Sequence, residues 1–121
     1  MATEADVRRI AMALPGTEEG GPQLGFAVAD PKGKARGYAW SWKERVDPKR
    51  ARVENRGVLA IRVGGEADKQ ALIAGDPEVF FTEPHYNGFP AVLVRLRRIK
   101  VAPLRKLLTD AHQLMSAPRR R

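Results

Sequence analysis

Apolar residues recur at helical spacing in three segments of the chain. Thr3 precedes the first of them as an N-terminal cap, and Pro15 with Gly16 ends it. The second segment covers residues 66–75, and the third begins at Pro103 with a broad apolar stripe. The pattern therefore predicts three helices.

Four other segments alternate apolar and small or polar residues at a period of two, which is typical of strands that bury one face. They are residues 23–29, 36–43, 58–63 and 91–98. Residues 30–34 contain Pro and Gly and predict a turn, whereas residues 44–57 predict a long polar loop.

The order helix, three strands, helix, strand, helix favours an antiparallel sheet, because the strands are grouped rather than alternating with helices. We expect an α+β fold, a two-layer sandwich with the helices packed on one face of the sheet and the other face open to water. Residues 1–117 would form this single domain, and residues 118–121 a basic tail.

Alternation assigns side chains to the two faces of the expected sheet. The face toward the helices would hold the large apolar residues Tyr38, Trp40, Trp42, Leu59, Ile61, Val63, Val92, Val94 and Leu96. The open face would then carry Lys43, Arg62, Arg95 and Arg97.

Charge is the most informative total. The chain has 22 Lys and Arg against 14 Asp and Glu, a net charge of +8. Nine cations lie in residues 32–56 and nine more from residue 95 onward. This clustering suits a phosphate backbone, and the alternative is a solvated basic surface that keeps the protein soluble.

Several function classes find no support. The absence of cysteine excludes disulfides, thiol catalysis and thiolate metal sites. No apolar run approaches the roughly 20 residues of a membrane helix, and the N-terminus does not read as a signal peptide, so we expect a cytoplasmic protein that does not engage a membrane. The size and compact pattern favour a monomer.

No enzyme signature is present either. The two histidines lack zinc-ligand spacing, and neither serine lies in a nucleophile elbow. His112 borders the apolar stripe of the last helix and is expected to pack there. We therefore predict a non-enzymatic protein with no cofactor and no metal.

Residues 80–96, FFTEPHYNGFPAVLVRL, form the most distinctive stretch. Pro84 and Pro90 restrict its backbone, and Asn87-Gly88 favours a turn. Residue chemistry leaves three roles open for this loop. They are a packing and turn role, a binding role for its polar groups, and catalysis by His85.

The longer stretch DPEVFFTEPHYNGFPAVLVRL resembles the signature of the MmcQ/YjbR-like family of small bacterial proteins, and the resemblance extends over nearly the whole chain. It implies a two-layer α/β fold and DNA binding through a double-wing motif. The matching positions are Thr82, Pro84, His85, Tyr86, Gly88 and Pro90. Glu83 stands where the family usually has Thr, and its carboxylate would repel phosphate unless Arg95 or Arg97 neutralises it.

The leading hypothesis is a module that binds DNA with little sequence specificity. The sequence does not distinguish DNA from RNA as the ligand. The expected phosphate contacts are Lys43, Arg45, Lys49, Arg50, Arg52, Arg62, Arg95 and Arg97. One alternative is a small-molecule or peptide pocket at Trp42, His85 and Tyr86. Another is an adaptor that holds a partner protein on the sheet.

Overall fold

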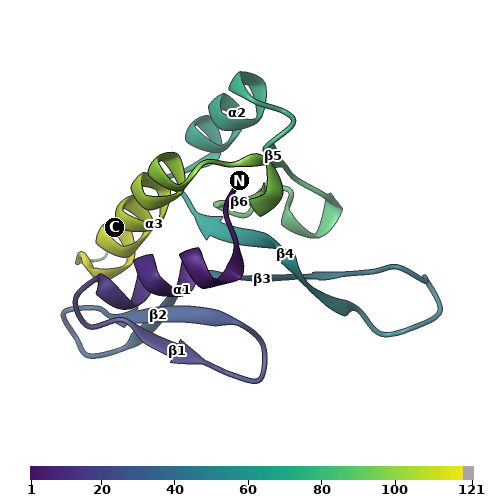
Figure 1. The fold of residues 1–121 in the computed structure, drawn as a ribbon. Helices are drawn as coiled ribbons and strands as arrows, with labels where there is room; N and C mark the ends of the chain where they lie inside the picture. Colours follow the sequence, from purple (N-terminus) through teal and green to yellow (C-terminus); the bar gives the residue numbers. More distant parts are fainter. Residues whose placement is uncertain (119–121) are drawn as a thin grey trace.

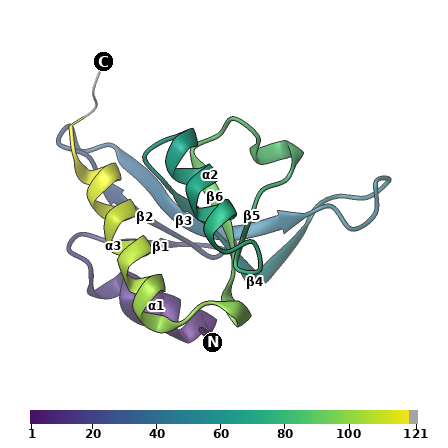
Figure 2. The same ribbon diagram turned by 90° about the horizontal axis from the view of Figure 1, so that it is seen from above.

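The computed structural model describes residues 1–118 and confirms the α+β fold, with a six-stranded antiparallel sheet and helices on one face (Figures 1 and 2). The strand order is β1-β2-β3-β4-β6-β5. The helices are α1 (Glu4–Ala13), α2 (Glu66–Gly75) and α3 (Val101–Ser116). The strands are β1 (Glu18–Gly20), β2 (Gly25–Ala29), β3 (Ala35–Glu44), β4 (Val53–Arg62), β5 (Phe80–Phe81) and β6 (Ala91–Arg95). Two 3₁₀ turns are η1 (Pro84–Tyr86) and η2 (Leu96–Arg98).

The expected cap of α1 is present as a reciprocal pair of hydrogen bonds. The Asp6 amide donates to Thr3 Oγ1 at 3.2 Å, and the Thr3 amide donates to Asp6 Oδ2 at 2.9 Å. This capping box satisfies two backbone groups that the first turn leaves unpaired. After the helix, Gly16 adopts a φ of 70°, which turns the chain toward β1.

The main core lies between the sheet and helices α1 and α3. Leu24, Phe26 and Val28 of β2 and its approach are buried there, as predicted, and so are the alternating residues of β4 and β6. Helix α3 contributes the fully buried Leu104 and Leu108. Helix α2 adds less, because its Leu72 and Ile73 are only partly buried against this core.

A second apolar cluster lies on the other face of the sheet, so the prediction that this face is open to water is wrong for the central strands. Its buried members are Val58, Ala60, Tyr86, Ala91 and Leu93, with Trp40, Trp42 and Phe81 packed against them. The loop of residues 82–90 brings Tyr86 over the sheet and covers it.

A bulge in β3 explains why the aromatic residues do not share one face. The β2–β3 register shifts at Phe26/Ala27, where Phe26 opposes Ala39 but Ala27 opposes Gly37. The extra residue, Tyr38, lies in the main core, whereas Trp40 and Trp42 belong to the second cluster. A bulge reverses the alternation that follows it, so the prediction for both tryptophans is wrong.

Three further predictions need correction. The polar loop expected at residues 44–57 is shorter, because residues 53–57 extend β4. The chain also forms two short edge strands, β1 and β5, that its pattern does not predict. Finally, β6 ends at Arg95, so Arg97 lies in η2 and not on the sheet.

None of the helices in residues 1–118 has the length and apolar character needed to span a bilayer. Of the expected basic tail, only residue 118 falls within the part of the chain that the structure describes, and Arg119, Arg120 and Arg121 lie outside it.

Candidate nucleic-acid interface

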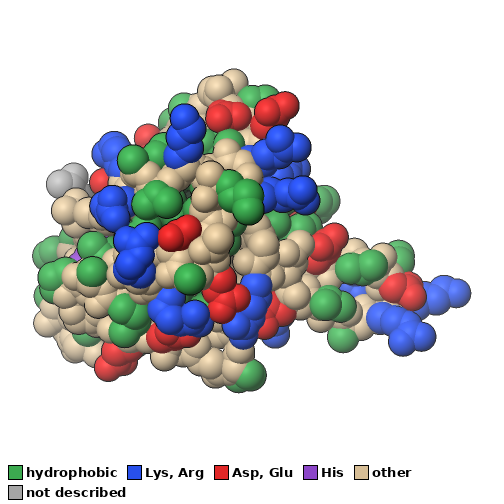
Figure 3. Space-filling model, in the orientation of Figure 1, with side chains coloured by type: hydrophobic (Ala, Val, Ile, Leu, Met, Phe, Trp, Pro, Cys, Tyr) green, Lys and Arg blue, Asp and Glu red, His purple; other side chains and the backbone are tan. Residues whose placement is uncertain are grey.

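The hairpin of β3 and β4 projects beyond the helices, away from the body of the molecule (Figures 1 and 2). Lys and Arg side chains gather at its tip in the space-filling view (Figure 3). Five of the eight expected phosphate contacts belong to this basic hairpin, which we define as residues 43–52: Lys43, Arg45, Lys49, Arg50 and Arg52. The structure thus brings these five residues onto one protruding element.

Hydrogen bonds within the basic hairpin hold its shape. Arg45 Nη1 donates to the carbonyl oxygen of Arg50 at 2.9 Å, and Arg52 Nη1 donates to that of Lys43 at 3.1 Å. Because both acceptors are neutral carbonyl groups, these two bonds leave the guanidinium charges uncompensated. Asp47 is the nearest acid to Arg50, at 3.6 Å between Nε and Oδ2, and both groups are largely exposed. Such an exposed pair contributes little to stability.

The base of the hairpin is tied to the main body by Glu54. Its Oε2 accepts hydrogen bonds from Ser41 Oγ at 2.5 Å and from the Leu24 amide at 2.9 Å. The bond from Ser41, the Leu24 amide and the charge of Arg56 together lower the pKa of Glu54, against a smaller opposing effect of burial. Ser41 is fully buried. Glu54 therefore anchors the hairpin as a carboxylate.

The other three expected contacts lie apart from the hairpin, and the expectation that Lys43, Arg62, Arg95 and Arg97 share one face is wrong. Trp42 packs on the second cluster, so Lys43, the next residue of β3, points to the opposite face of the sheet. Arg62 and Arg95 lie on the same face as that cluster, and Arg97 is exposed on η2.

Arg95 has a packing role in this structure. Its guanidinium carbon lies 4.1 Å from the centroid of the Phe81 ring, and Nη1 donates to the carbonyl oxygens of Pro77 and Glu78, at 3.3 Å each. Neither Arg95 nor Arg97 neutralises Glu83 in the described part of the chain, where Glu83 Oε1 is buried without a hydrogen-bond partner. The condition under which Glu83 would not repel phosphate is therefore not met in this part of the chain.

Lys69 of α2 anchors the loop of residues 82–90 through hydrogen bonds to the loop backbone. Lys69 is completely buried, and its Nζ donates to the carbonyl oxygens of Tyr86 at 2.5 Å and Phe89 at 3.1 Å. Within this loop, Tyr86 accepts a hydrogen bond on its hydroxyl group from Trp40 Nε1 at 3.0 Å. The interpretation of this loop as a packed turn therefore has direct structural support.

Trp42, His85 and Tyr86, the residues of the alternative pocket, do not line the cavities between α2 and α3 or beside the β2–β3 turn. Trp42 packs edge-on against Phe81, with ring centroids 5.5 Å apart, and Tyr86 is buried. His85 alone of the three is exposed, next to Tyr86 on η1.

The second histidine packs as predicted. His112 Nε2 donates to the carbonyl oxygen of Pro15 at 2.6 Å, and the imidazole lies edge-on to Tyr38. His112 therefore joins α3 to the chain that follows α1.

Comparisons with known proteins show close relatives but no assigned activity. No family model matches the chain. The uncharacterised protein Rv2570 of Mycobacterium tuberculosis is 40% identical over 119 residues, which cover 98% of this chain and 92% of the relative. The uncharacterised protein Mb2600 of Mycobacterium bovis matches to the same extent. Among solved structures, protein DR2400 of Deinococcus radiodurans, described by its domain DUF419, aligns with a TM-score of 0.70. The alignment covers 94% of this chain and 78% of the DR2400 chain, and at 24% identity the match shows a common fold.

Proposed function

The chain belongs to the same family as Rv2570 of Mycobacterium tuberculosis, and we propose that it is a non-enzymatic protein that binds double-stranded DNA through its basic hairpin. The observation that carries the proposal is the form of this hairpin. It projects from the body and carries Lys and Arg side chains at its tip (Figure 3), and Lys43, Arg45, Lys49 and Arg50 are exposed on it. A protruding element can approach a duplex without interference from the rest of the molecule.

The charge of the hairpin supports phosphate contacts. Residues 43–52 contain five cations and two acids, Glu44 and Asp47. Glu44 accepts a hydrogen bond from Asn55 at 3.1 Å, and Asp47 accepts one from the Lys49 amide at 2.9 Å, so both acids have a structural role. Lys and Arg that contact phosphates supply affinity and orientation without reading bases. The proposed binding is therefore weakly sequence-specific.

The sequence resemblance supports the same conclusion. Members of the MmcQ/YjbR-like family are commonly labelled DNA-binding because of a likeness to a double-wing motif, and the β3–β4 hairpin has the form of one such wing. Under this proposal the packed loop of residues 82–90 has a structural role, and the protein acts in the cytoplasm as a monomer.

The test is fluorescence anisotropy with a labelled duplex of about 20 base pairs, from about 50 to 200 mM salt, the range over which phosphate contacts weaken strongly. We expect saturable binding that weakens as salt rises. The double variant Lys49→Gln/Arg50→Gln should reduce the slope of log K against log salt by about 2, because each phosphate contact contributes about 0.9.

The matched control is Arg98→Gln/Lys100→Gln, which removes two exposed cations outside the hairpin. This control should retain most of the wild-type slope. Absence of binding at the lowest salt would overturn the proposal, and so would an equal loss in both double variants. The same titration with single-stranded DNA and with an RNA duplex identifies the preferred nucleic acid.

A further inference from the structure

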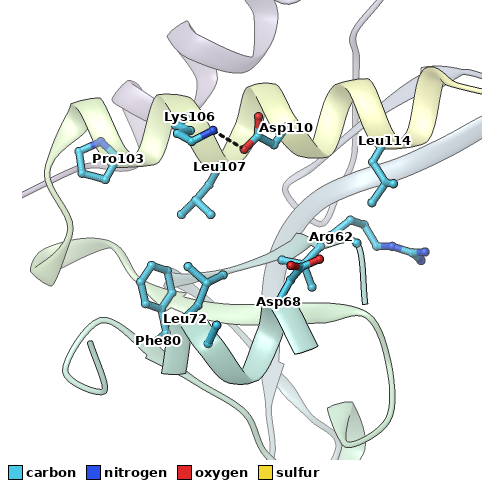
Figure 4. A pocket seen from close by; sticks show the side chains of 12 residues that line it. Arg62, Asp68, Leu72, Phe80, Pro103, Lys106, Leu107, Asp110 and Leu114 are labelled. Atoms are coloured by element: carbon cyan, nitrogen blue, oxygen red, sulfur yellow. Dashed lines mark hydrogen bonds and ion pairs between the residues drawn. The ribbon is translucent and has the colours of Figure 1, made fainter. Parts of the chain in front are cut away.

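A groove that the basic hairpin does not use runs between helices α2 and α3. Its first part, the apolar cavity, has a volume of about 710 Å³, and Leu72, Phe80, Leu107 and Leu114 project into it (Figure 4). This volume lies within the range of about 300–1,000 Å³ that is usual for small-molecule sites.

The second part, the basic cavity, lies beside the β2–β3 turn and has a volume of about 870 Å³. Lys32, Lys34, Arg36 and Arg62 line it. The two cavities share Arg62, Val63, Gly64 and Leu114, so they are neighbouring parts of one groove. One end of this groove is therefore apolar and the other is cationic.

We propose that this groove binds a single-chain amphipathic anion, with its alkyl tail in the apolar cavity and its carboxylate or phosphate head in the basic cavity. The residues that line the groove support this proposal, because the alkyl tail would meet an apolar surface and the head group a cationic one. A nucleic acid would leave the apolar cavity unfilled, and a neutral lipid would bring no anion to Lys32, Lys34 and Arg36.

The apolar cavity exists because α2 is held away from α3. Lys69 is the buried residue of α2, and its hydrogen bonds to the loop of residues 82–90 direct that face of the helix toward the loop. Leu72 on the neighbouring face remains half-buried. Apolar surface of this kind gains free energy when an alkyl chain covers it.

Acidic residues are outnumbered at the basic end of the groove, where one of them, Asp30, lines the cavity against four cations among the residues that the structure describes. Asp110 pairs with Lys106 at 3.0 Å on the α3 side (Figure 4). Asp30 accepts hydrogen bonds from the amides of Lys32 and Lys34, at 2.9 and 3.0 Å, and so shapes the turn. Asp68 lines the apolar cavity near Gly64. The guanidinium carbon of Arg62 lies 5.0 Å from the centroid of the Phe89 ring, so Lys32, Lys34 and Arg36 are the cations proposed to hold the head group.

The test is isothermal titration calorimetry of the full chain with monomeric octanoate, decanoate and decyl phosphate. Affinity should rise about fourfold for each added methylene group, the gain expected when a CH₂ leaves water. Decyltrimethylammonium, which has the same tail and the opposite charge, should bind at least tenfold more weakly than decanoate. The comparison of decanoate with decyl phosphate identifies the head group. Equal affinity for the decyl anions and the decyl cation would overturn the proposal, as would an absence of chain-length dependence.

Two variants locate the ligand. Ala71→Trp fills the apolar cavity and should abolish binding, whereas Ala74→Trp, on the same helix but outside the lining, should retain it. Lys34→Gln/Arg36→Gln should remove most of the preference for the anion. Lys49→Gln/Arg50→Gln should leave decanoate binding unchanged, so failure of this proposal and failure of DNA binding are distinguished. Loss of binding in Ala74→Trp equal to that in Ala71→Trp would place the ligand elsewhere.

Discussion

Lys69 Nζ lies 2.5 Å from the carbonyl oxygen of Tyr86, and this hydrogen bond joins helix α2 to the loop that precedes strand β6. The lysine is completely buried and also donates to Phe89. The two carbonyl oxygens also accept backbone bonds from the Phe89 and Ala91 amides, and the buried cation adds a charge-assisted hydrogen bond to each of them. Lys69 is thus a central support of the loop of residues 82–90.

Replacement of Lys69 by methionine should destabilise the protein by about 2–4 kcal/mol, because it removes two buried charge-assisted hydrogen bonds. Urea unfolding measures this loss, and hydrogen exchange should show faster exchange at Phe89 and Ala91, whose amides bond within or beside the loop. The control is Lys100→Met, at an exposed lysine, which should change stability by about 0.5 kcal/mol or less. Similar losses in the two variants would contradict the supporting role of Lys69.

Glu54 should make stability depend on pH in the acidic range. Its pKa in the folded protein is lowered, chiefly by the hydrogen bond from Ser41. A lowered folded pKa stabilises the protein above the unfolded pKa, and this contribution is lost as pH falls through the folded pKa. We expect the difference in unfolding free energy between wild type and Glu54→Gln to shrink between about pH 6 and pH 3.

Denaturant unfolding at both pH values measures this change, with Glu78→Gln, at an exposed carboxylate, as the control. The wild type retains some pH dependence from Asp6 and Glu19, whose pKa values are also lowered, by their hydrogen bonds to Arg9 and Arg8 respectively. A wild-type-to-variant difference that is the same at both pH values would show that Glu54 does not act as an anchoring carboxylate.

Arg95 should act through stability and not through DNA binding, in contrast to its expected role as a phosphate contact. Arg95→Ala removes the contact with Phe81 and two hydrogen bonds, so we expect a loss of about 1–2 kcal/mol in urea unfolding. The salt slope of duplex binding should stay within experimental error of wild type. A slope reduced by about 1 in this variant would instead show that Arg95 contacts a phosphate group.

The main core should tolerate truncation poorly. Leu108→Ala should cost about 2–5 kcal/mol, because Leu108 is fully buried and its truncation leaves a cavity. Leu114, on the same helix but 37% exposed, gives the matched control and should cost about 1 kcal/mol or less as alanine. Equal losses of unfolding free energy in Leu108→Ala and Leu114→Ala, measured by thermal or urea unfolding, would show that the core does not depend on the packing of Leu108.

The long, regular elements of this fold follow from local pattern. Helix α1 begins at the predicted cap, and Leu59, Ile61, Val92 and Val94 face the main core as their alternation predicts. Alternation fails at Tyr38, because a bulge depends on how β2 pairs with β3 and leaves no mark in the local pattern. Strands of two and three residues, such as β5 and β1, are too short to show a period at all.

The site was harder to predict than the fold. The clustered cations of residues 43–52 predict a basic element, and the structure places them on one hairpin. Lys69 carries no such signal, because a lysine in a helix usually faces water and its acceptors lie 17 and 20 residues away in the chain. The groove between α2 and α3 depends on the distance between two helices, which residue periodicity does not contain.

The two outermost strands also limit how this sheet can grow. Strand β1 has three residues, all exposed and two of them glutamates, and β5 has two residues. Each edge therefore presents few backbone N–H and C=O groups in register, and at β1 it presents negative charge as well. An incoming strand would find little to pair with on either side. The architecture thereby resists the edge-to-edge joining that leads antiparallel sheets into fibrils.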